Sequence, residues 1–291
     1  MVLQLTHHVV PVFAARLACL LGAWLFMAAA VAQQINAGPY VPSPQSVVAD
    51  MLKVAGIGPA DFVIDLGSGD GRIVLTAAKV YGASGFGVEI QDDLVKLSNE
   101  AARAEGLADR VKFVKQDLFK TDISQATVLT MYLLPNTVNM LSEKLQNELR
   151  PGTRILSHDY GLSGWIPETT QQFDLEDKIK ISGVTTTIIF LYVVPAKVAG
   201  QWRSAVAPAV SRQPVSFELR QQMQKIGGMA RVDGREVPIE DAKLVGERIS
   251  FRLPAARGRV LAFNGTVKGR AIEGTVDSAG VRSPWSATLA N

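Results

Sequence analysis

The sequence predicts an α/β protein with a mostly parallel sheet, followed by a smaller antiparallel all-β domain. Three observations support this prediction. Short apolar runs alternate with helical patterns over the first two thirds of the chain, and a glycine-rich turn follows the first run. Short strands separated by glycine turns fill the last third. The 291 residues suffice for two domains of ordinary size and for a substantial core.

Strands and helices alternate regularly in the first part of the chain. We expect strands in 61–67, 84–90, 110–117, 126–135 and 153–159, helices in 45–57, 71–82, 92–107 and 137–152, and a final hairpin of two strands in 173–182 and 185–195. This order predicts a Rossmann-like sheet with helices on both faces. Ligands of such sheets bind at the carboxyl ends of the strands.

The chain divides by pattern into a sheet domain in 38–196, a linker in 197–213 and an antiparallel, barrel-like β domain in 214–291. Alternation predicts the inward-facing residues of the β domain: Phe217, Leu219, Ile249, Phe251, Ile272 and Trp285. From residue 200 onward 14 Lys and Arg oppose 8 Asp and Glu. The β domain is therefore interpreted as a spacing module, or as a basic surface that docks on an acidic partner or membrane.

Residues 1–32 form a separate segment with an uncharged run in 17–32 after Arg16. Ala30, Val31 and Ala32 have the small-x-small form of a signal-peptidase site, while the run is short for a membrane span. The segment predicts a signal peptide or an N-terminal membrane anchor, with a misassigned start codon as a third possibility. The protein is then expected to be exported to the periplasm or anchored to a membrane. An orientation that faces the cytosol is kept as an alternative. The single cysteine, Cys19, lies inside the segment, so its cleavage would leave no thiol for a disulfide, a metal-thiolate site or a cysteine nucleophile. We expect no metal site.

The glycine turn reads Gly67, Ser68, Gly69, Asp70 and Gly71, directly after a strand that carries Asp65. A dinucleotide fold would have G-x-G-x-x-G and would leave room for a pyrophosphate. Here the third glycine comes one residue early, and the carboxylate of Asp70 would repel phosphate. S-adenosylmethionine has no phosphate and carries an ammonium and a sulfonium, so the turn predicts this cofactor.

Acids at the ends of the next two strands fit the same cofactor. Glu89 ends the second strand, where a carboxylate can accept hydrogen bonds from both ribose hydroxyls. Asp117 ends the third, where it can accept from the adenine amino group while Leu118 packs on the ring. One such acid is as often a helix cap, but three at successive strand ends favour a shared ligand.

From about residue 40 to residue 195 the chain resembles a class I S-adenosylmethionine-dependent methyltransferase, through "DLGSGDGRIV", "GVEI" and "QDLF". The segment "PYVPSP" ahead of "DLGSGDGR" is similar to that of small protein-lysine methyltransferases acting on membrane proteins such as the ATP synthase c-ring protein and the adenine nucleotide translocase. The resemblance implies a seven-stranded sheet with an antiparallel last strand. It also implies methyl transfer to a protein lysine, with a membrane or envelope protein as the expected acceptor.

The sequence shows no complete set of general acid and base residues, so the catalytic residues stay unknown. After the fourth strand "YLLPN" replaces the Asn/Asp-Pro-Pro-aromatic motif of enzymes that methylate nucleic-acid amino groups, which argues against a nucleic-acid partner. Tyr132 is the candidate substrate-channel residue. His158 and Asp159 should point to opposite faces of their strand, one capping a loop and the other solvated. We expect Arg72 to pair with nearby carboxylates. Two alternatives to protein methylation are kept. One is a small-molecule methyltransferase with a lid in 160–170, and the other is an exported non-catalytic binding protein on this fold.

Overall fold

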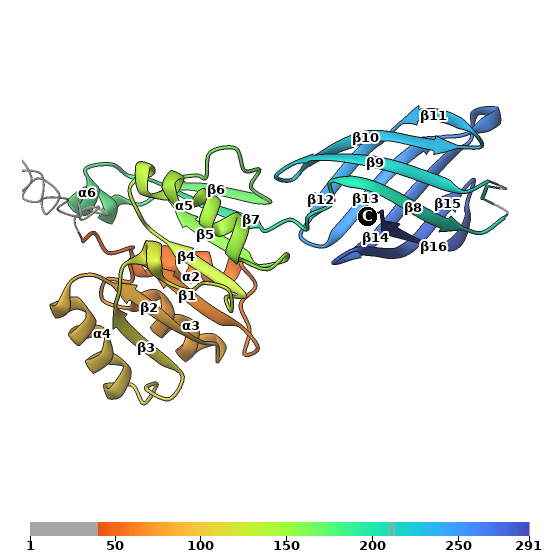
Figure 1. Cartoon of the computed structure of the whole chain (residues 1–291). Helices are drawn as coiled ribbons and strands as arrows, with labels where there is room; N and C mark the ends of the chain where they lie inside the picture. Colours follow the sequence, from red (N-terminus) through yellow and green to blue (C-terminus); the bar gives the residue numbers. More distant parts are fainter. Residues whose placement is uncertain (1–39, 209, 212, 291) are drawn as a thin grey trace, which may run out of the picture. The chain divides into compact units, whose positions relative to one another are not determined.

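The computed structural model describes residues 40–208, 210, 211 and 213–290 (Figure 1). The expected signal peptide or anchor in 1–32 lies outside these residues. Within the part of the chain that is described, no helix is both long and apolar enough to cross a membrane. The described residues form two sheets that follow one another along the sequence.

The first sheet has seven strands in the order β3-β2-β1-β4-β5-β7-β6. The strands are β1 (Phe62–Leu66), β2 (Ser84–Glu89), β3 (Val111–Lys115), β4 (Val128–Met131), β5 (Arg154–His158), β6 (Thr169–Asp174) and β7 (Thr186–Val193). β1 to β5 are parallel, while β7 runs antiparallel to β5 and to β6. The strand order reverses between β1 and β4, so a ligand is expected at the carboxyl ends of these two strands. The predicted α/β class is confirmed.

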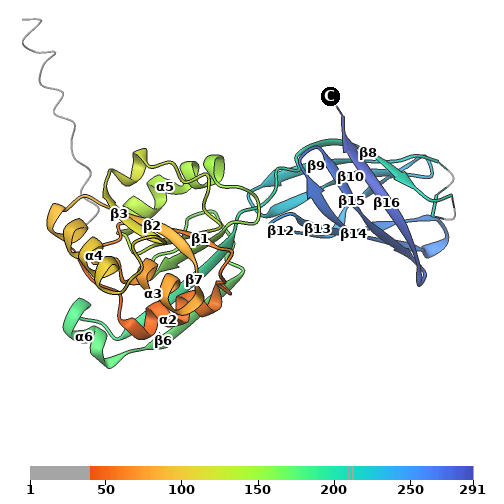
Figure 2. The same ribbon diagram turned by 90° about the horizontal axis from the view of Figure 1, so that it is seen from below.

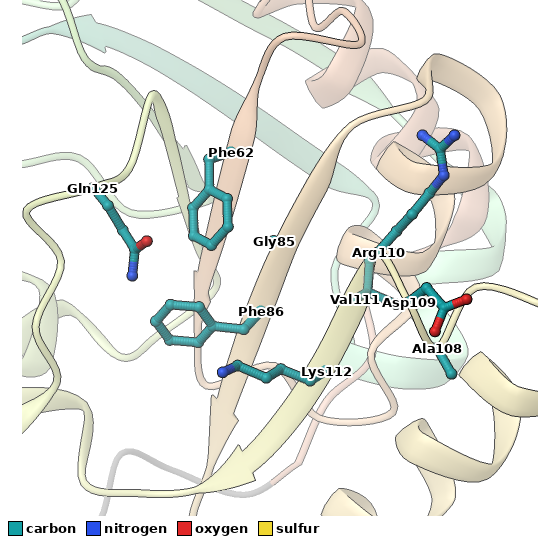
Figure 3. Close-up of a pocket in the computed structure, with 9 residues that line it drawn as sticks. All are labelled: Phe62, Gly85, Phe86, Ala108, Asp109, Arg110, Val111, Lys112 and Gln125. Atoms are coloured by element: carbon teal, nitrogen blue, oxygen red, sulfur yellow. The ribbon is translucent and has the colours of Figure 1, made fainter.

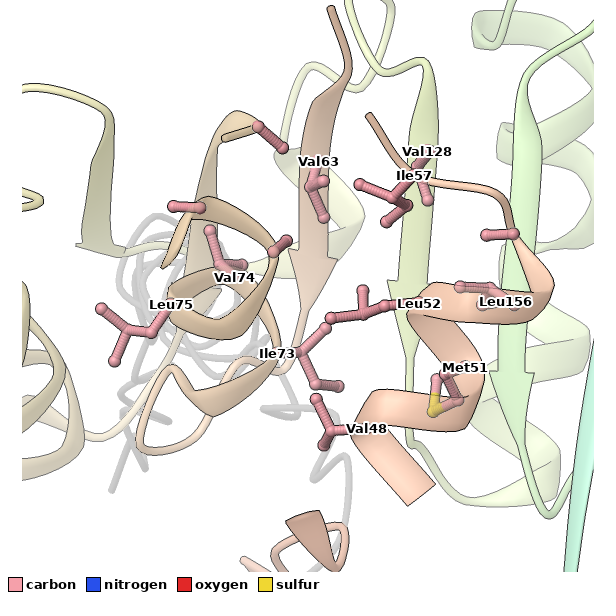
Figure 4. Close-up of a cluster of buried hydrophobic side chains, with 14 of the residues drawn as sticks. Val48, Met51, Leu52, Ile57, Val63, Ile73, Val74, Leu75, Val128 and Leu156 are labelled. Carbon is pink, nitrogen blue, oxygen red and sulfur yellow. The ribbon is translucent and has the colours of Figure 1, made fainter. Parts of the chain in front are cut away.

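Helices cover both faces of this sheet. They are α2 (Gln45–Val54), α3 (Arg72–Tyr81), α4 (Asp92–Ala104), α5 (Pro135–Glu148), α6 (Glu176–Ser182) and the 3-10 turn η1 (Leu118–Lys120). α2 and α3 pack on one face through a buried cluster that includes Met51, Leu52, Ile73 and Val63 (Figure 4). α5 lies across the sheet from α2 and α3 (Figure 2). Both faces of the sheet are thus buried, so a ligand can bind only where the strands end.

The final hairpin differs from the expectation in one strand. The pattern predicts a strand in 173–182, but β6 ends at Asp174 and α6 occupies most of that range. The isoleucines of α6 alternate as in a strand. However, Gly183 has a φ of 77° and its N–H bonds to the carbonyl of Ile179, which closes a helical turn. Because β7 is antiparallel, α6 lies at the same edge of the sheet as the carboxyl end of β5.

The second sheet has nine antiparallel strands in the order β11-β10-β9-β8-β16-β15-β14-β13-β12 and forms a nearly closed barrel. Its strands are β8 (Gly200–Val206), β9 (Val215–Gln222), β10 (Lys225–Val232), β11 (Arg235–Pro238), β12 (Glu240–Val245), β13 (Arg248–Pro254), β14 (Val260–Lys268), β15 (Ala271–Ser278) and β16 (Val281–Leu289), with a 3-10 turn η2 (Ala256–Gly258). The predicted linker 197–213 is wrong over β8, which pairs with β9 and β16. The side chain of Trp202 is buried in the barrel core. The polar residues around Trp202 make the segment resemble a linker in the sequence.

Aromatic rings fill the barrel interior. The rings of Phe251 and Phe263 stack at 5.0 Å between centroids, and Trp285 meets Phe263 edge-on at 4.9 Å. All six residues expected on the inward faces are buried. Strand alternation alone placed them, because side chains of a barrel strand point alternately in and out.

Candidate active site

The glycine turn after β1 is bent by three glycines in the left-handed region. Gly67, Gly69 and Gly71 have φ values of 80°, 52° and 81°, which residues with a Cβ rarely adopt. A Cβ on Gly69 would lie 2.5 Å from the ring of Tyr40, and one on Gly67 would lie 2.8 Å from Leu133. Glycine is therefore required both for the turn and for the close approach of these two side chains.

Asp65 and Ser68 place unusual polar groups beside this turn. Asp65 is 2% exposed and accepts a hydrogen bond of 2.7 Å from the hydroxyl of Thr130 on β4. Burial, with the charges of Glu89 and Asp70, raises the pKa of Asp65 to about 7 against the lowering effect of Thr130. The Ser68 hydroxyl is buried and has no hydrogen-bond partner among the described residues. A bound cation with polar groups of its own would satisfy both.

Glu89 ends β2 and folds back over the glycine turn. Its Oε2 accepts the N–H of Gly69 at 3.0 Å, and its Oε1 accepts the N–H groups of Ile90 and Gln91 at 2.7 and 3.1 Å. These backbone donors fix the carboxylate at the carboxyl end of β2. The sequence placed Glu89 at this edge, and the structure brings it together with Gly69.

Asp70 is engaged by Arg72 at the start of α3. Arg72 donates to both carboxylate oxygens, with its Nη2 at 2.5 Å, so the pairing expected for Arg72 is confirmed. Although burial raises the pKa of Asp70, these bonds and the charge of Arg72 hold it below its ordinary value. Arg72 also donates to the carbonyl of Ser43 at 2.8 Å, and Asp70 interacts with the hydroxyl of Tyr40. The segment ahead of α2 is thereby tied to the turn.

Asp117 and Leu118 follow β3 next to Glu89. The N–H of Gln116 donates to the Glu89 carbonyl at 3.0 Å, which brings the two strand ends together. The Asp117 side chain is 41% exposed and accepts the N–H of Phe119 at 2.9 Å, while Leu118 is buried. Asp117 therefore caps η1 and keeps part of its carboxylate open.

A second polar cluster lies at the ends of β4 and β5. The rings of Tyr132 and His158 are 4.0 Å apart between centroids, at 33°. His158 is fully buried, and its Nδ1 is 2.9 Å from the hydroxyl of Ser43. Burial lowers the pKa of His158 to about 4, and the charge of Lys178 adds to this against Asp159, so the imidazole is neutral at pH 7.

The expectation for His158 and Asp159 is wrong on two points. Neither side chain is solvated, because that of His158 is fully buried and that of Asp159 is only 14% exposed, and the two side chains do not point apart. β5 ends at His158, and Asp159 has a φ of 63°, so its Oδ1 lies 3.5 Å from Nε2 of His158. Asp159 is held in turn by Lys178 of α6, a nearly buried lysine at 2.6 Å from Oδ2.

Tyr40, Ser43 and Lys178 belong to this edge, although the sequence patterns did not single them out. Tyr40 and Ser43 lie in "PYVPSP", whose prolines carry the resemblance described above. The sequence signal that could have identified them is a tyrosine and a serine immediately ahead of the first helix. Lys178 had none, because its pairing with Asp159 depends on the fold of α6.

A surface depression at the opposite edge of the sheet does not belong to the site. Phe62, Gly85 and Val111, which line it, stand at or near the amino ends of β1, β2 and β3 (Figure 3). The glycine turn and the acids stand at the carboxyl ends of the same strands. The candidate active site is therefore at the edge that carries the glycine turn, Glu89, Tyr132 and Asp159.

Comparisons with known proteins single out the same region. A family model for the ANTKMT methyltransferase domain matches residues 65–169, which run from Asp65 to the start of β6. The chain is 42% identical over 157 residues to a protein-lysine N-methyltransferase of Saccharolobus islandicus, covering 54% of this chain and 93% of that protein. It is 34% identical over 129 residues to an adenine nucleotide translocase lysine N-methyltransferase of Mus musculus. That match covers 44% of this chain and 56% of the mouse protein.

Solved structures of methyltransferases resemble the same part of the chain. The crystal structure of an RNA methyltransferase from Salinibacter ruber in complex with S-adenosyl-L-homocysteine is 42% identical, with a TM-score of 0.49. It covers 54% of this chain and 96% of that chain. The left-handed glycines, the orphaned Ser68 hydroxyl and the carboxylates of Asp65 and Glu89 fit S-adenosylmethionine, which supplies the methyl group when bound. The chain belongs to the protein-lysine N-methyltransferase family with the ANTKMT methyltransferase domain and is an S-adenosylmethionine-dependent methyltransferase.

Proposed function

We propose that this enzyme methylates lysine side chains of proteins. The observation that carries the proposal is the match to the Saccharolobus protein-lysine N-methyltransferase over nearly all of that protein. The region matched by the family model contains the glycine turn and also Tyr132, His158 and Asp159, called the Tyr132 cluster from here on. In this proposal the strand-end residues bind the cofactor and the Tyr132 cluster receives the acceptor.

Each strand-end residue has a part in the proposed cofactor site. Glu89 accepts hydrogen bonds from the ribose hydroxyls, and Asp65 faces the ammonium and sulfonium. Asp117 and Leu118 hold the adenine. Gly67, Ser68, Gly69 and Gly71 supply the turn itself. Asp70 acts through Arg72, because its oxygens are already paired there. S-adenosylmethionine supplies an activated methyl group, so the protein mainly positions and desolvates the amine.

The proposed acceptor is a membrane or envelope protein. Apolar side chains stand exposed around the Tyr132 cluster, at 42% for Leu134, 52% for Ile179 and 55% for Val184. They follow β4, lie on α6 and precede β7, so they surround the edge that carries the cluster. An apolar rim suits a lysine that emerges from an apolar segment. The animal relatives include an enzyme named for the adenine nucleotide translocase.

We also propose that the N-terminal segment attaches the enzyme to a membrane with the site facing the cytosol. The uncharged run in 17–32 supports attachment. The orientation follows from the cofactor, whose charges prevent unaided passage across a bilayer. Reporter fusions placed before and after residue 33 test this directly. If the fusion placed after residue 33 is active only on the periplasmic side of the membrane, the proposed orientation is contradicted.

The experiment for the acceptor uses a strain that lacks the gene. Membrane and soluble fractions receive enzyme and cofactor with a tritiated methyl group, and label is counted in protein, RNA and small molecules. We expect label in membrane protein, recovered as methyl-lysine after hydrolysis. At a limiting cofactor concentration Glu89→Ala should strongly reduce this label, and Glu100→Ala, on the exposed side of α4, should not. Label only in small molecules or in RNA would contradict lysine methylation.

A further inference from the structure

Hydrogen-bond donors converge on the carboxylate of Asp159. Its Oδ1 accepts from Nζ of Lys178 at 2.7 Å and from the N–H of Ile188 at 3.1 Å, and its Oδ2 lies 2.6 Å from the same Nζ. The Asp159 and Lys178 side chains are 14% and 2% exposed. Lys178 also donates to the carbonyl of Thr186. The ion pair is therefore fixed from two elements, β7 and α6.

Tyr132 lies beside this cluster, because its ring is 4.0 Å from that of His158 between centroids and Nε2 of His158 is 3.5 Å from Oδ1 of Asp159. Burial, and then the charge of Asp159 and a side-chain hydrogen bond to it, raise the pKa of Tyr132, so the phenol stays protonated. An ionised carboxylate only accepts hydrogen bonds, and an ammonium only donates. Toward Asp159 the Tyr132 hydroxyl can therefore act only as a hydrogen-bond donor. The polarity of the chain from Lys178 through Asp159 to Tyr132 is thus determined by the ion pair.

A hydroxyl that donates its proton to Asp159 keeps lone pairs free to accept. The tyrosine oxygen therefore favours a ligand that brings an N–H or O–H donor. His158, which stacks on the Tyr132 ring, is neutral because burial lowers its pKa to about 4, so it adds no positive charge that would repel an amine in its protonated form. Tyr132 is only half-buried, and can be reached from outside.

Tyr132 also stands next to the cofactor turn. Leu133, the following residue, approaches Gly67 so closely that a Cβ there would lie 2.8 Å from it. His158 is joined through Ser43 to Arg72 and hence to Asp70 of the turn. An acceptor bound at Tyr132 is therefore beside the turn that the cofactor needs.

We propose that the Tyr132 oxygen accepts an N–H from the methyl-accepting amine, and that the Lys178–Asp159 ion pair positions it for this. The inference rests on the proposed lysine methylation and names the residues that select the amine. The bound ammonium first releases a proton to water. The nitrogen lone pair then forms the new N–C bond as the S–C bond breaks, and the bonding electrons of the S–C bond stay on sulfur. Tyr132 is a catalytic residue in this scheme, and Asp159 and Lys178 are positioning residues.

The first test is Tyr132→Phe, which keeps the ring against His158 and removes the oxygen. We expect the initial rate of transfer to membrane protein from the deletion strain to fall about tenfold to a hundredfold, the effect of losing one hydrogen bond to an amine. Calorimetric binding of S-adenosylhomocysteine should not change. An unchanged transfer rate would overturn the proposal.

The second test removes the ion pair as a whole, with Asp159→Asn and Lys178→Met together, so that no buried charge is left unpaired. Asparagine tolerates the positive φ, but its amide both donates and accepts, so the polarity is no longer fixed. We expect the rate to fall to about that of Tyr132→Phe, and the triple variant to lose little more. Additive losses would overturn the positioning role.

A spectroscopic readout separates positioning from general instability. The ¹³Cζ signal of Tyr132, identified by its loss in Tyr132→Phe, should titrate at lower pH in the double variant than in the wild type. An unchanged titration would mean that Asp159 does not act on Tyr132. Label found in wild-type assays only in RNA or small molecules would contradict the proposed function and the amine together. Label in protein that Tyr132→Phe leaves unchanged would contradict the Tyr132 contact alone.

Discussion

Glu89 Oε2 accepts the backbone N–H of Gly69, twenty positions earlier in the sequence, at 3.0 Å, so the end of β2 and the turn after β1 hold one another. The other oxygen is held by the N–H groups of Ile90 and Gln91. The carboxylate is therefore oriented before any ligand arrives, which reduces the entropy lost on binding.

Glu89→Ala should weaken binding of S-adenosylmethionine by about 2 to 3 kcal/mol, because the ribose hydroxyls would lose a charged acceptor. Isothermal calorimetry with the wild type measures the difference. Glu100→Ala on α4 is the matched control and should bind as the wild type does. Equal affinities of wild type and Glu89→Ala would contradict the proposed role of this carboxylate.

Asp65 should make cofactor binding depend on pH. Its pKa of about 7 means that raising the pH through neutrality creates the negative charge that a cationic ligand favours. Affinity for S-adenosylmethionine should therefore rise from about pH 6 to about pH 8, and Asp65→Asn should flatten the curve. Calorimetry across this range is the measurement, and an affinity that falls with pH in the wild type would contradict it.

The same carboxyl should affect stability without ligand. The folded-state pKa lies above the ordinary value of 3.8, so the native state binds more protons than the unfolded state between these two values. The free energy of unfolding should fall as pH rises through this window, by at least about 1 kcal/mol, and level off above it. Urea unfolding at several pH values tests this. Asp65→Asn should lose this component, and an identical pH profile would argue against it.

Gly87→Ala should destabilise the first sheet by about 1 to 3 kcal/mol. A Cβ at Gly87 on β2 would lie 2.4 Å from Cβ of Ser68 and 2.7 Å from the ring of Phe113, and both of these neighbours are buried. Gly227→Ala on β10 is the control, since nothing lies within 4 Å of a Cβ there. Thermal unfolding should show a lower Tm for Gly87→Ala alone. Similar Tm values for both variants would show that the turn relaxes freely.

A chain that ends at Pro195 should fold and bind cofactor. β7 ends at Val193, so all seven strands and Glu89 are retained, and β8 begins only at Gly200. Circular dichroism and calorimetry with S-adenosylhomocysteine are the measurements. A shortened chain that is insoluble, or that is folded but does not bind, would mean that the barrel takes part in the site and that the boundary near residue 196 is misplaced.

The sequence alone determined those features that depend on local pattern. Alternating apolar runs predicted the parallel sheet, and period-two alternation identified the barrel interior, including Phe251 and Trp285. Parallel strands end at one edge, so acids at strand ends could be assigned to one site without knowing the fold in detail. Glu89 and the glycine turn were predicted in this way, and the structure places them in contact.

Only the tertiary structure decided the features that depend on distant partners. α6 has an alternating pattern that fits a strand, and the turn at Gly183 makes it a helix. β8 has the composition of a linker, and its pairing with β9 and β16 makes it a strand. The positive φ of Asp159 reverses the direction that strand alternation predicts for its side chain, and only then does it meet Lys178. Periodicity reports which face of an element is apolar, whereas hydrogen bonds between elements are decided by the packing that brings them together.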